Sequence, residues 1–317
     1  MRPMDTPIAA GLALGAAADL VLADPRRGHP VAGFGAVAAA LERRVWRDSR
    51  VAGSIHTVGL VVAATCVGAF LDRATRGHPV ARTLVTAATA WTVLGGTSLA
   101  RAANRMHTAL AAGDLAGGRT ALPALAGRDP RHLGAHELAR ATVESVAENT
   151  SDAAVAPLFW GAIAGLPGLL GYRAVNTLDA MVGHHSPRYE RFGWAAARLD
   201  DLANWLPARL TAALTVACAR STGGSAAGAL RTWLRDGAAH PSPNSGRCEA
   251  AMAGALGVRL GGRNVYGTRV EDRPGLGTGA APTAADIPTA VRLSRAVWVA
   301  AAVLTAASRL LPRRSPS

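Results

Sequence analysis

The chain has 317 residues, of which half are hydrophobic, 17% are charged and 4% are aromatic. Its formal net charge is +13, and arginine carries all of the positive charge because the sequence contains no lysine. A basic chain with so few aromatics and no basic–aromatic alternation is not typical of nucleic-acid-binding proteins, so the charge favours anionic lipid or phosphate-bearing ligands. The three cysteines form neither a CxxC pair nor a zinc spacing, which argues against disulfides and structural zinc.

Taken in chain order, six apolar segments predict the helices of an all-α fold. Several approach the roughly 20 residues that a helix needs to cross a bilayer, and three lack interior acids and are bracketed by arginines. We therefore expect a polytopic, multi-pass protein of the cell (inner or plasma) membrane, with the lipid bilayer as a partner and polar cytoplasmic loops. The alternative is a soluble, alanine-rich helical core. The segments are Thr6–Ala23, Val51–Leu71, Val80–Ala100, Ala153–Gly171, Trp205–Ala219 and Ala290–Leu311.

The connections indicate how these segments are organised. The loop Asp24–Arg50 is rich in arginine and is the best cytoplasmic candidate. Ala153–Gly171 is interrupted by Pro157 and by a GLPG sequence, so it either spans the bilayer or re-enters it within protein. We expect a single domain over 1–317, with a Gly/Pro-rich surface loop at 268–289 before the last helix.

Two polar motifs lie in the first half of the chain, one directly after the first apolar segment and one directly before the fourth. In DP…GHPV, prolines hold Asp24 and His29 in an extended turn, for which a simple helix-terminating loop is the plain interpretation. In ESVAENTSD, Glu144, Glu148 and Asp152 follow one another at steps of four residues, next to Asn149. Like charges at this spacing destabilise an isolated helix by roughly 0.2–0.5 kcal/mol per pair, so a compensating cation is expected. An N-cap role explains Ser151 or Asp152 but does not explain the two glutamates.

The third and fourth motifs carry further polar residues. YRAVNTLDAMVG and the following FGWAAARLDDLANWLPAR place arginine, aspartate and asparagine at helical spacing beside apolar residues. Oxygen-rich Asp/Asn clusters suit Mg²⁺, and arginines bind phosphate oxygens; internal Arg–Asp pairing is the alternative. In HPSPNSG, Ser242 and Asn244 precede a helix and present donors suited to an anion. The polar residues of the third motif are Arg173, Asn176, Asp179, Arg198, Asp200, Asp201, Asn204 and Arg209.

Together these motifs, with PLFW…GLPG and AMAGALGVRLGG…NVYG, run in unbroken order from about Ala10 to Gly267. In this combination the chain resembles the CobD/CbiB family, whose members are adenosylcobinamide-phosphate synthases of cobalamin biosynthesis. The resemblance implies an ATP- and Mg²⁺-dependent acid–amine ligase. Its substrates would be adenosylcobyric acid, through a propionate carboxylate, and (R)-1-aminopropan-2-ol or its O-phosphate. Association with other corrinoid-pathway enzymes is a further expectation.

We assign the candidate site residues on this basis. The catalytic candidates are Glu144, Glu148, Asp152, Asp179, Arg198 and Asp201. The candidates for substrate or phosphate binding are Asp24, His29, Asn149, Arg173, Asn176, Arg209, Ser242 and Asn244. The magnesium candidates are Asp200, Asp201 and Asn204. A corrinoid transporter, or a non-catalytic membrane sensor or accessory protein of related fold, is the competing class.

Overall fold

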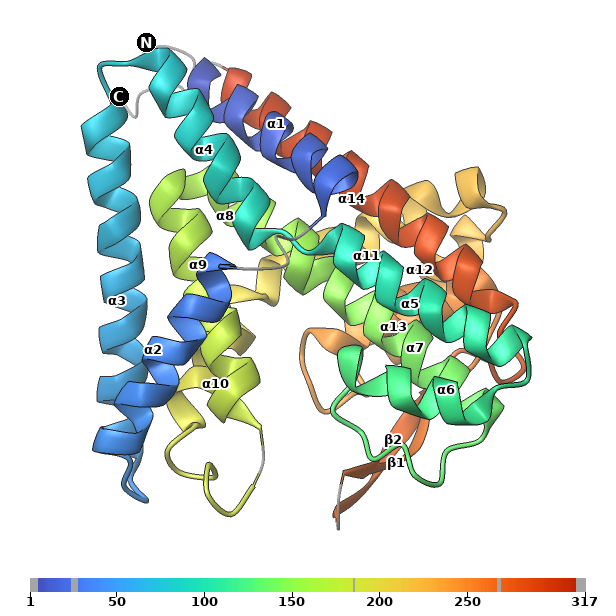
Figure 1. The fold of residues 1–317 in the computed structure, drawn as a ribbon. Coiled ribbons are helices and arrows are strands. Elements are labelled where there is room, and N and C mark those ends of the chain that lie inside the picture. The colour runs from blue at the N-terminus through green and yellow to red at the C-terminus, as the bar shows by residue number, and fades with distance from the viewer. Residues whose placement is uncertain (1–4, 24–27, 185, 267–268, 312–317) are drawn as a thin grey trace. The chain divides into compact units, whose positions relative to one another are not determined.

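The structure is a computed structural model that describes residues 5–23, 28–184, 186–266 and 269–311. Apart from one pair of strands, all regular elements in these residues are helical, so the all-α prediction is confirmed. The chain divides into two compact units (Figure 1). Unit 1 comprises Met1–Gly95, Asp152–Asn204 and Ala301–Ser317, and unit 2 comprises Gly96–Ser151 and Trp205–Ala300.

Unit 1 contains seven complete α-helices among its described residues, together with the last turns of α14. Four of its helices meet at one end through an ion-pair network (Figure 1). Asp5, before α1, lies 3.0 Å from Arg82 of α4 and 3.2 Å from Arg309 of α14, and Arg82 lies 2.8 Å from Asp72 of α3. The seven helices are α1 (Thr6–Leu22), α2 (Pro30–Val45), α3 (Arg50–Thr75), α4 (Pro79–Val93), α8 (Ala156–Ala164), α9 (Leu166–Leu178) and α10 (Trp194–Ala203).

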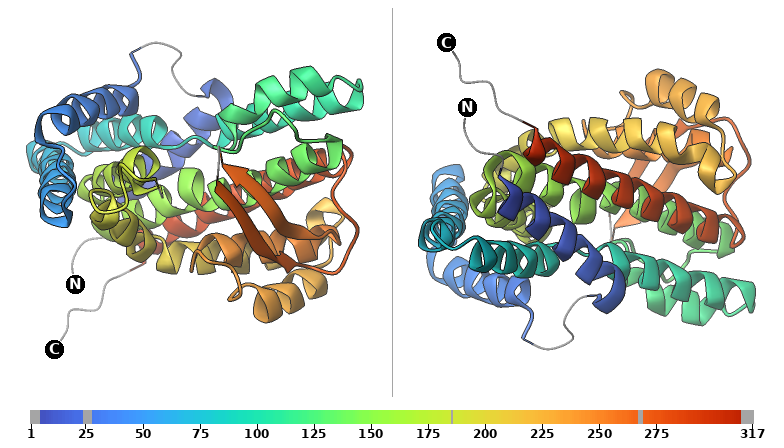
Figure 2. Two further views of the ribbon diagram at one scale, coloured as in Figure 1. Left: turned by 90° about the horizontal axis from the view of Figure 1, so that it is seen from below. Right: turned by 90° about the horizontal axis from the view of Figure 1, so that it is seen from above.

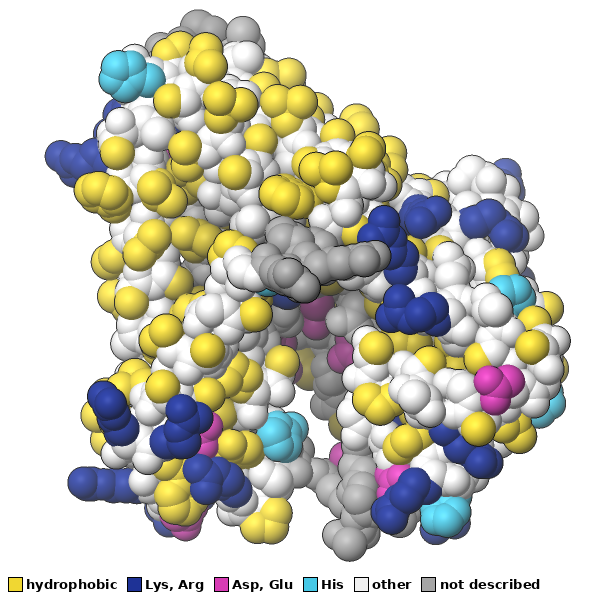
Figure 3. All heavy atoms as spheres, viewed as in Figure 1, with side chains coloured by type: hydrophobic (Ala, Val, Ile, Leu, Met, Phe, Trp, Pro, Cys, Tyr) yellow, Lys and Arg dark blue, Asp and Glu magenta, His cyan; other side chains and the backbone are white. Residues whose placement is uncertain are grey.

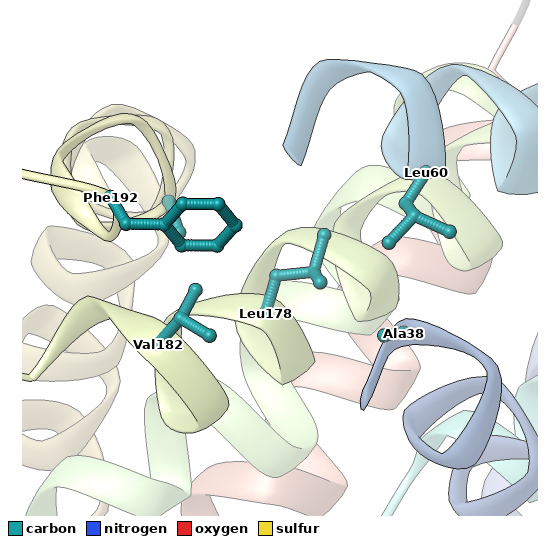
Figure 4. Packing of buried hydrophobic residues seen from close by; sticks show 6 residues of the cluster. Ala38, Leu60, Leu178, Val182 and Phe192 are labelled. Carbon is teal, nitrogen blue, oxygen red and sulfur yellow. The ribbon is translucent and has the colours of Figure 1, made fainter. Parts of the chain in front are cut away.

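The core of unit 1 packs α2, α3, α9 and α10 together. Phe192, Val182, Leu178 and Leu60 converge on Ala38 of α2, and all of them are buried (Figure 4). Close approach of α3 to the start of α9 depends on a small residue at position 68. A Cβ atom added to Gly68 would lie 2.6 Å from the carbonyl oxygen of Leu166.

Unit 2 packs α5, α7, α11, α12 and α13 in neighbouring pairs, and an antiparallel hairpin contacts α7, α12 and α13 (Figure 2). The hairpin register is irregular between Leu260 and Gly262, where Gly261 and Gly262 both have positive φ. The elements of unit 2 are α5 (Gly96–Ala111), α6 (Leu115–Ala121), α7 (Ala135–Thr150), α11 (Trp205–Cys218), α12 (Ala226–Asp236), α13 (Ser245–Leu256), β1 (Leu260–Tyr266), β2 (Arg269–Leu276) and most of α14 (Asp286–Leu310).

Four predicted segments differ from the structure. The expected loop Asp24–Arg50 contains α2, which begins at Pro30 and is capped by His29. The apolar run Val80–Ala100 is two helices, because Leu94 is extended and the amide of Gly95 donates to the carbonyl of Ala153 at 3.0 Å instead of continuing α4. Ala153–Gly171 is divided at Gly165, whose φ of +66° is in the left-handed region that favours glycine. The segment 268–289, expected to be a loop, contains β2.

Among the described residues, α3 and α14 are the two helices long and apolar enough to cross a membrane. In α3 the most apolar window is only 22% buried. Its exposed side chains include Ile55 and Phe70, which are 71% and 70% exposed. Hydrophobic side chains also cover much of the visible surface of α1, α3 and α4 (Figure 3). The core helices of a soluble protein are mostly buried, whereas α3 leaves most of its apolar side chains exposed. Such an exposed apolar face is typical of a surface that contacts a membrane or another protein.

Candidate functional site

Helix α7 presents two of the predicted glutamates to polar partners in unit 2. Glu144 is 2% exposed and forms an ion pair with Arg128, which is itself buried. The second carboxylate oxygen of Glu144 accepts a hydrogen bond of 2.7 Å from the amide of Gly261 in the hairpin. The compensating cation expected from the sequence is therefore an arginine, and the same carboxylate also connects α7 to β1.

Glu148, one turn further along α7, contacts the predicted HPSPNSG loop. The hydroxyl of Ser245 donates to the Glu148 carboxylate at 2.6 Å. The Ser242 hydroxyl accepts from the amides of Asn244 and Ser245, at 3.3 and 3.2 Å, at the start of α13. Ser242 therefore has a capping role, while Asn244 is 7% exposed and lies within the unit. The structure thus brings Glu148 and this loop together, as a shared site requires.

Two buried ionisable residues, Glu249 of α13 and His240, join this cluster although neither was predicted. Glu249 is 1% exposed, and neither of its carboxyl oxygens has a hydrogen-bond partner among the described residues. The Nε2 atom of His240 lies 3.9 Å from it. Burial, followed by the charges of Glu144 and Glu148, raises the pKa of Glu249 well above its ordinary value, against the opposing effect of Arg273 and Arg128. Burial lowers the pKa of His240. Both shifts favour the neutral forms of the two groups, the protonated carboxyl of Glu249 and the unprotonated imidazole of His240.

This protonation state predicts a pH-dependent stability. In the folded protein Glu249 keeps its proton above pH 4.5, its ordinary pKa, whereas the unfolded chain releases it. The free energy of unfolding should therefore fall as pH rises, by up to about 1.4 kcal/mol per pH unit until the folded-state pKa is reached. Glu249→Gln, which mimics the neutral form, should lack this contribution and be more stable than the wild type at pH 8.

Denaturant unfolding in detergent at pH 5 and pH 8 measures this difference. Glu137→Gln, at an exposed position of the same unit, is the matched control and should keep the wild-type pH dependence. Equal slopes for Glu249→Gln and the wild type would mean that Glu249 is ionised in the folded protein.

In unit 1, a second polar cluster surrounds the hydroxyl of Tyr172. This hydroxyl donates to the Asn204 side-chain oxygen at 2.9 Å, and the Asn204 amide donates to the Asp200 carboxylate at 3.0 Å. Asp152 and Asp200 both act electrostatically on Tyr172. The structure therefore groups Asp200, Asn204 and Asp152, all three predicted from the sequence, and adds Tyr172, which was not predicted.

Arg173 and Asn176 extend this cluster along α9. The Asn176 amide nitrogen lies 3.5 Å from the Asp152 carboxylate, and its oxygen lies 3.4 Å from the Arg173 guanidinium. Asp152 and Asp179 each lie in a π-helical turn, Ser151–Val155 and Asp179–Gly183. Such turns occur often at functional sites. Asp152 and Ser151 thus continue a helical path and do not serve as N-caps.

The remaining predicted residues make local contacts. Asp201 pairs with Arg198 at 3.5 Å and so lies apart from the Asp200 contacts, because adjacent helical residues point about 100° apart. Burial raises the pKa of Asp201, and the Arg198 charge opposes this effect. Arg209 stacks on Trp205 at 4.0 Å, Asn149 donates to the Ser145 carbonyl at 2.9 Å, and His29 accepts from the amide of Val31 at the start of α2. Asp24 lies outside the described residues.

The oxygen-rich cluster of unit 1 matches the chemistry of Mg²⁺. No group of three or more His, Cys, Asp or Glu residues among those described is arranged to enclose a metal ion. Mg²⁺, however, keeps several waters and is usually bound through one or two carboxylates together with substrate phosphates. The carboxylates of Asp200, next to Asn204, and of Asp152, next to Asn176, would supply the ligands of that second arrangement.

Fold and sites together define a mostly helical protein with buried, arginine-paired carboxylates and an outward apolar helix. Residues 12–294 match the family model described as CobD/Cbib protein, and the chain belongs to that family. It is 54% identical over 309 residues to the "Cobalamin biosynthesis protein CobD" of Mycobacterium tuberculosis strain H37Rv, covering 97% of each chain.

Two further relatives with the same name are more distant. The protein of Geobacter metallireducens is 47% identical over 267 residues, covering 82% of this chain and 83% of its own. A protein of Rhodobacter capsulatus is 44% identical over 281 residues, covering 85% of this chain and 86% of its own. No solved structure shows a significant match. The resemblance found in the sequence motifs is confirmed at the level of the family.

Proposed function

We propose that the protein acts in cobalamin biosynthesis as an ATP-dependent ligase. It would join the propionate carboxylate of adenosylcobyric acid to the amine of (R)-1-aminopropan-2-ol or of its O-phosphate. The observation that carries this proposal is membership of the CobD/Cbib family over residues 12–294, because that range contains every predicted motif except the start of the first helix. The names of the relatives support the pathway, and the chemistry of the two clusters supports the reaction.

The reaction imposes two requirements on the residues. A carboxylate is a poor acyl donor, and Mg²⁺–ATP, when bound, supplies the phosphoryl group that activates it. In unit 1, Asp152 and Asp200 would hold the metal, and Arg173 would bind phosphate oxygens bidentately. Their fixed charges would stabilise the negative charge that develops during transfer.

Formation of the amide also requires a proton acceptor, because an ammonium group is not nucleophilic. In unit 2, Glu148 is ionisable and oriented by the Ser245 hydroxyl. We assign the acceptor role to Glu148. Glu144, which is bound to Arg128 and to the Gly261 amide, would position α7 relative to the hairpin.

We also propose that the protein is a multi-pass membrane protein. The apolar, outward-facing window of α3 supports this localisation, as does the length of α14. The network of Asp5, Asp72, Arg82 and Arg309 lies where α1 and α4 begin and α3 and α14 end. The arginine-rich residues 43–50 lie at the other end of α3, the end that the positive-inside rule assigns to the cytoplasm.

Direct assay of the purified protein tests the reaction. With adenosylcobyric acid, aminopropanol phosphate, ATP and Mg²⁺, it should form adenosylcobinamide phosphate and release ADP and phosphate. The same mixture without ATP should form no amide, because condensation of a carboxylate with an amine in water is uphill. If ATP remains intact and no amide forms with either amine, the ligase proposal is wrong. Retention of the corrinoid under those conditions would instead favour a binding or transport role.

A further inference from the structure

A pocket of about 410 Å³ lies in unit 2 between α7 and the hairpin. Three arginines line it: Arg140 from α7, and Arg259 and Arg263 from the hairpin segment. Gly261 and Gly262 separate the last two in the sequence and also line the pocket. None of the residues predicted as candidates from the sequence lines this pocket, so it is a separate feature of the unit.

The lining of the pocket has an excess of positive charge. Among the described lining residues the one carboxylate is that of Glu137, which accepts a hydrogen bond of 2.8 Å from the amide of Gly134 at the start of α7. The side chains of Arg259 and Arg263 are exposed, and they form no hydrogen bond or ion pair with any described residue. Guanidinium groups that line one pocket without a protein partner are suited to bind an anion.

The pocket is also structurally fixed. The guanidinium of Arg140 donates to the carbonyl of Gly261, to that of Arg263 at 2.7 Å and to the Asn264 side chain at 3.3 Å. Gly262 has a φ of +88°, and a Cβ atom there would lie 2.8 Å from Arg140 Nη1. Glycine therefore lets the guanidinium lie directly against the strand. Arg140 holds the hairpin in place, which leaves Arg259 and Arg263 as the groups available to a ligand.

We propose that this pocket binds the phosphate group of a small phosphate ester through Arg259 and Arg263. The proposal rests on the proposed function for the identity of the ester. There it is the O-phosphate of the amine substrate, because the nucleotide phosphates are assigned to Arg173 and the carboxylates of unit 1. A response of ATP in the test below would instead move the nucleotide to this pocket. Binding at this pocket would place that group against α7, the helix that carries Glu144 and Glu148.

Calorimetric titration of the full-length protein in detergent tests the pocket without requiring turnover. The probes are aminopropanol O-phosphate, ATP and unphosphorylated aminopropanol. Arg259→Gln and Arg263→Gln should each weaken the binding of one of the two phosphate esters by about tenfold or more, while binding of unphosphorylated aminopropanol stays unchanged. The ester that responds identifies the source of the phosphate. Arg231→Gln, at an exposed arginine of α12, is the matched control and should bind all three probes as the wild type does.

Equal affinities of the two pocket variants and Arg231→Gln for both esters would overturn the proposal, as would failure of both esters to bind the wild type. Equal losses for aminopropanol and its phosphate would also overturn it, because the phosphate would then not be recognised. These outcomes are independent of the ligase assay. If the esters bind in a way that depends on Arg259 and Arg263 but no amide forms, only the ligase proposal is wrong. If the amide forms and the two substitutions do not affect its formation, only the proposal for the pocket is wrong.

Discussion

Glu144→Ala is expected to destabilise the protein by about 3–5 kcal/mol, the range for removal of one partner of a buried ion pair. The substitution leaves the Arg128 guanidinium buried without its carboxylate and removes the acceptor of the Gly261 amide. The loss should appear as a lower midpoint in denaturant unfolding in detergent, with the hairpin the first region to lose protection from hydrogen exchange.

Asp129→Ala is the matched control, because it also removes an arginine partner in unit 2. Arg131, the partner of Asp129, has a side chain that is 74% exposed, so its charge remains solvated when the carboxylate is removed. We expect little change in the unfolding midpoint. In the double variant Arg128→Ala/Glu144→Ala, the total loss should be smaller than the sum of the single losses. Additive losses, or an effect of Glu144→Ala as small as that of the control, would contradict a coupled buried pair.

Asp200→Asn is expected to lower kcat for amide formation by about 10²–10³-fold, the usual effect of removing one group that stabilises a transition state electrostatically. Asparagine keeps a polar contact to Asn204 but removes the charge near Tyr172. The variant should also require more Mg²⁺ for half-maximal activity, because it lacks one of the two carboxylates proposed to bind the metal. Steady-state measurement of ADP and amide over a range of Mg²⁺ concentrations reports both effects.

Asp48→Asn provides the comparison for this variant, since Asp48 forms an ion pair with Arg191 whose side chains are both 59% exposed. Its kcat and Mg²⁺ requirement should match the wild type. Asp201→Asn separates the two adjacent aspartates, because Asp201 is paired with Arg198. A normal Mg²⁺ requirement in Asp200→Asn together with a raised one in Asp201→Asn would move the metal to the other side of α10.

The helices that begin and end at strong signals were predictable from the sequence. Continuous apolar runs in α3 and α14 are local features, and the structure follows them closely. Helix α2 was missed, because Pro30 at its first turn was taken as part of the loop Asp24–Arg50. The break at Leu94 and Gly95 was not predictable, because it depends on the carbonyl of Ala153, which lies far away in the sequence. In the hairpin, Pro274 and Gly275 within β2 conceal the strand pattern, so the segment has the composition of a loop.

The two polar clusters could also be predicted only as far as they depend on residues close in the sequence. The four-residue step between Glu144 and Glu148 places both acids on one face of α7, and the repulsion between them predicted a cation. The fold alone shows that this cation is Arg128 and that Glu144 also contacts the amide of Gly261. Glu249 carried one usable signal that we did not weigh: it is the only acid in a helix of small residues, where a buried carboxyl is uncommon.

The π-helical turn Asp179–Gly183 also bears on the evolutionary history of the chain. A turn of this kind is what a one-residue insertion leaves in an α-helix, so deletion of a single residue would restore regular winding. The turn is the last one of the helix, which ends at Gly183 with His184 extended, so restored winding would change the direction in which the chain leaves α9. A Cβ atom on Gly183 would lie only 1.8 Å from an Asp179 carboxylate oxygen, so the glycine leaves room for this carboxylate within the turn. We therefore expect length variation among relatives to avoid this turn and to accumulate in the connections between helices.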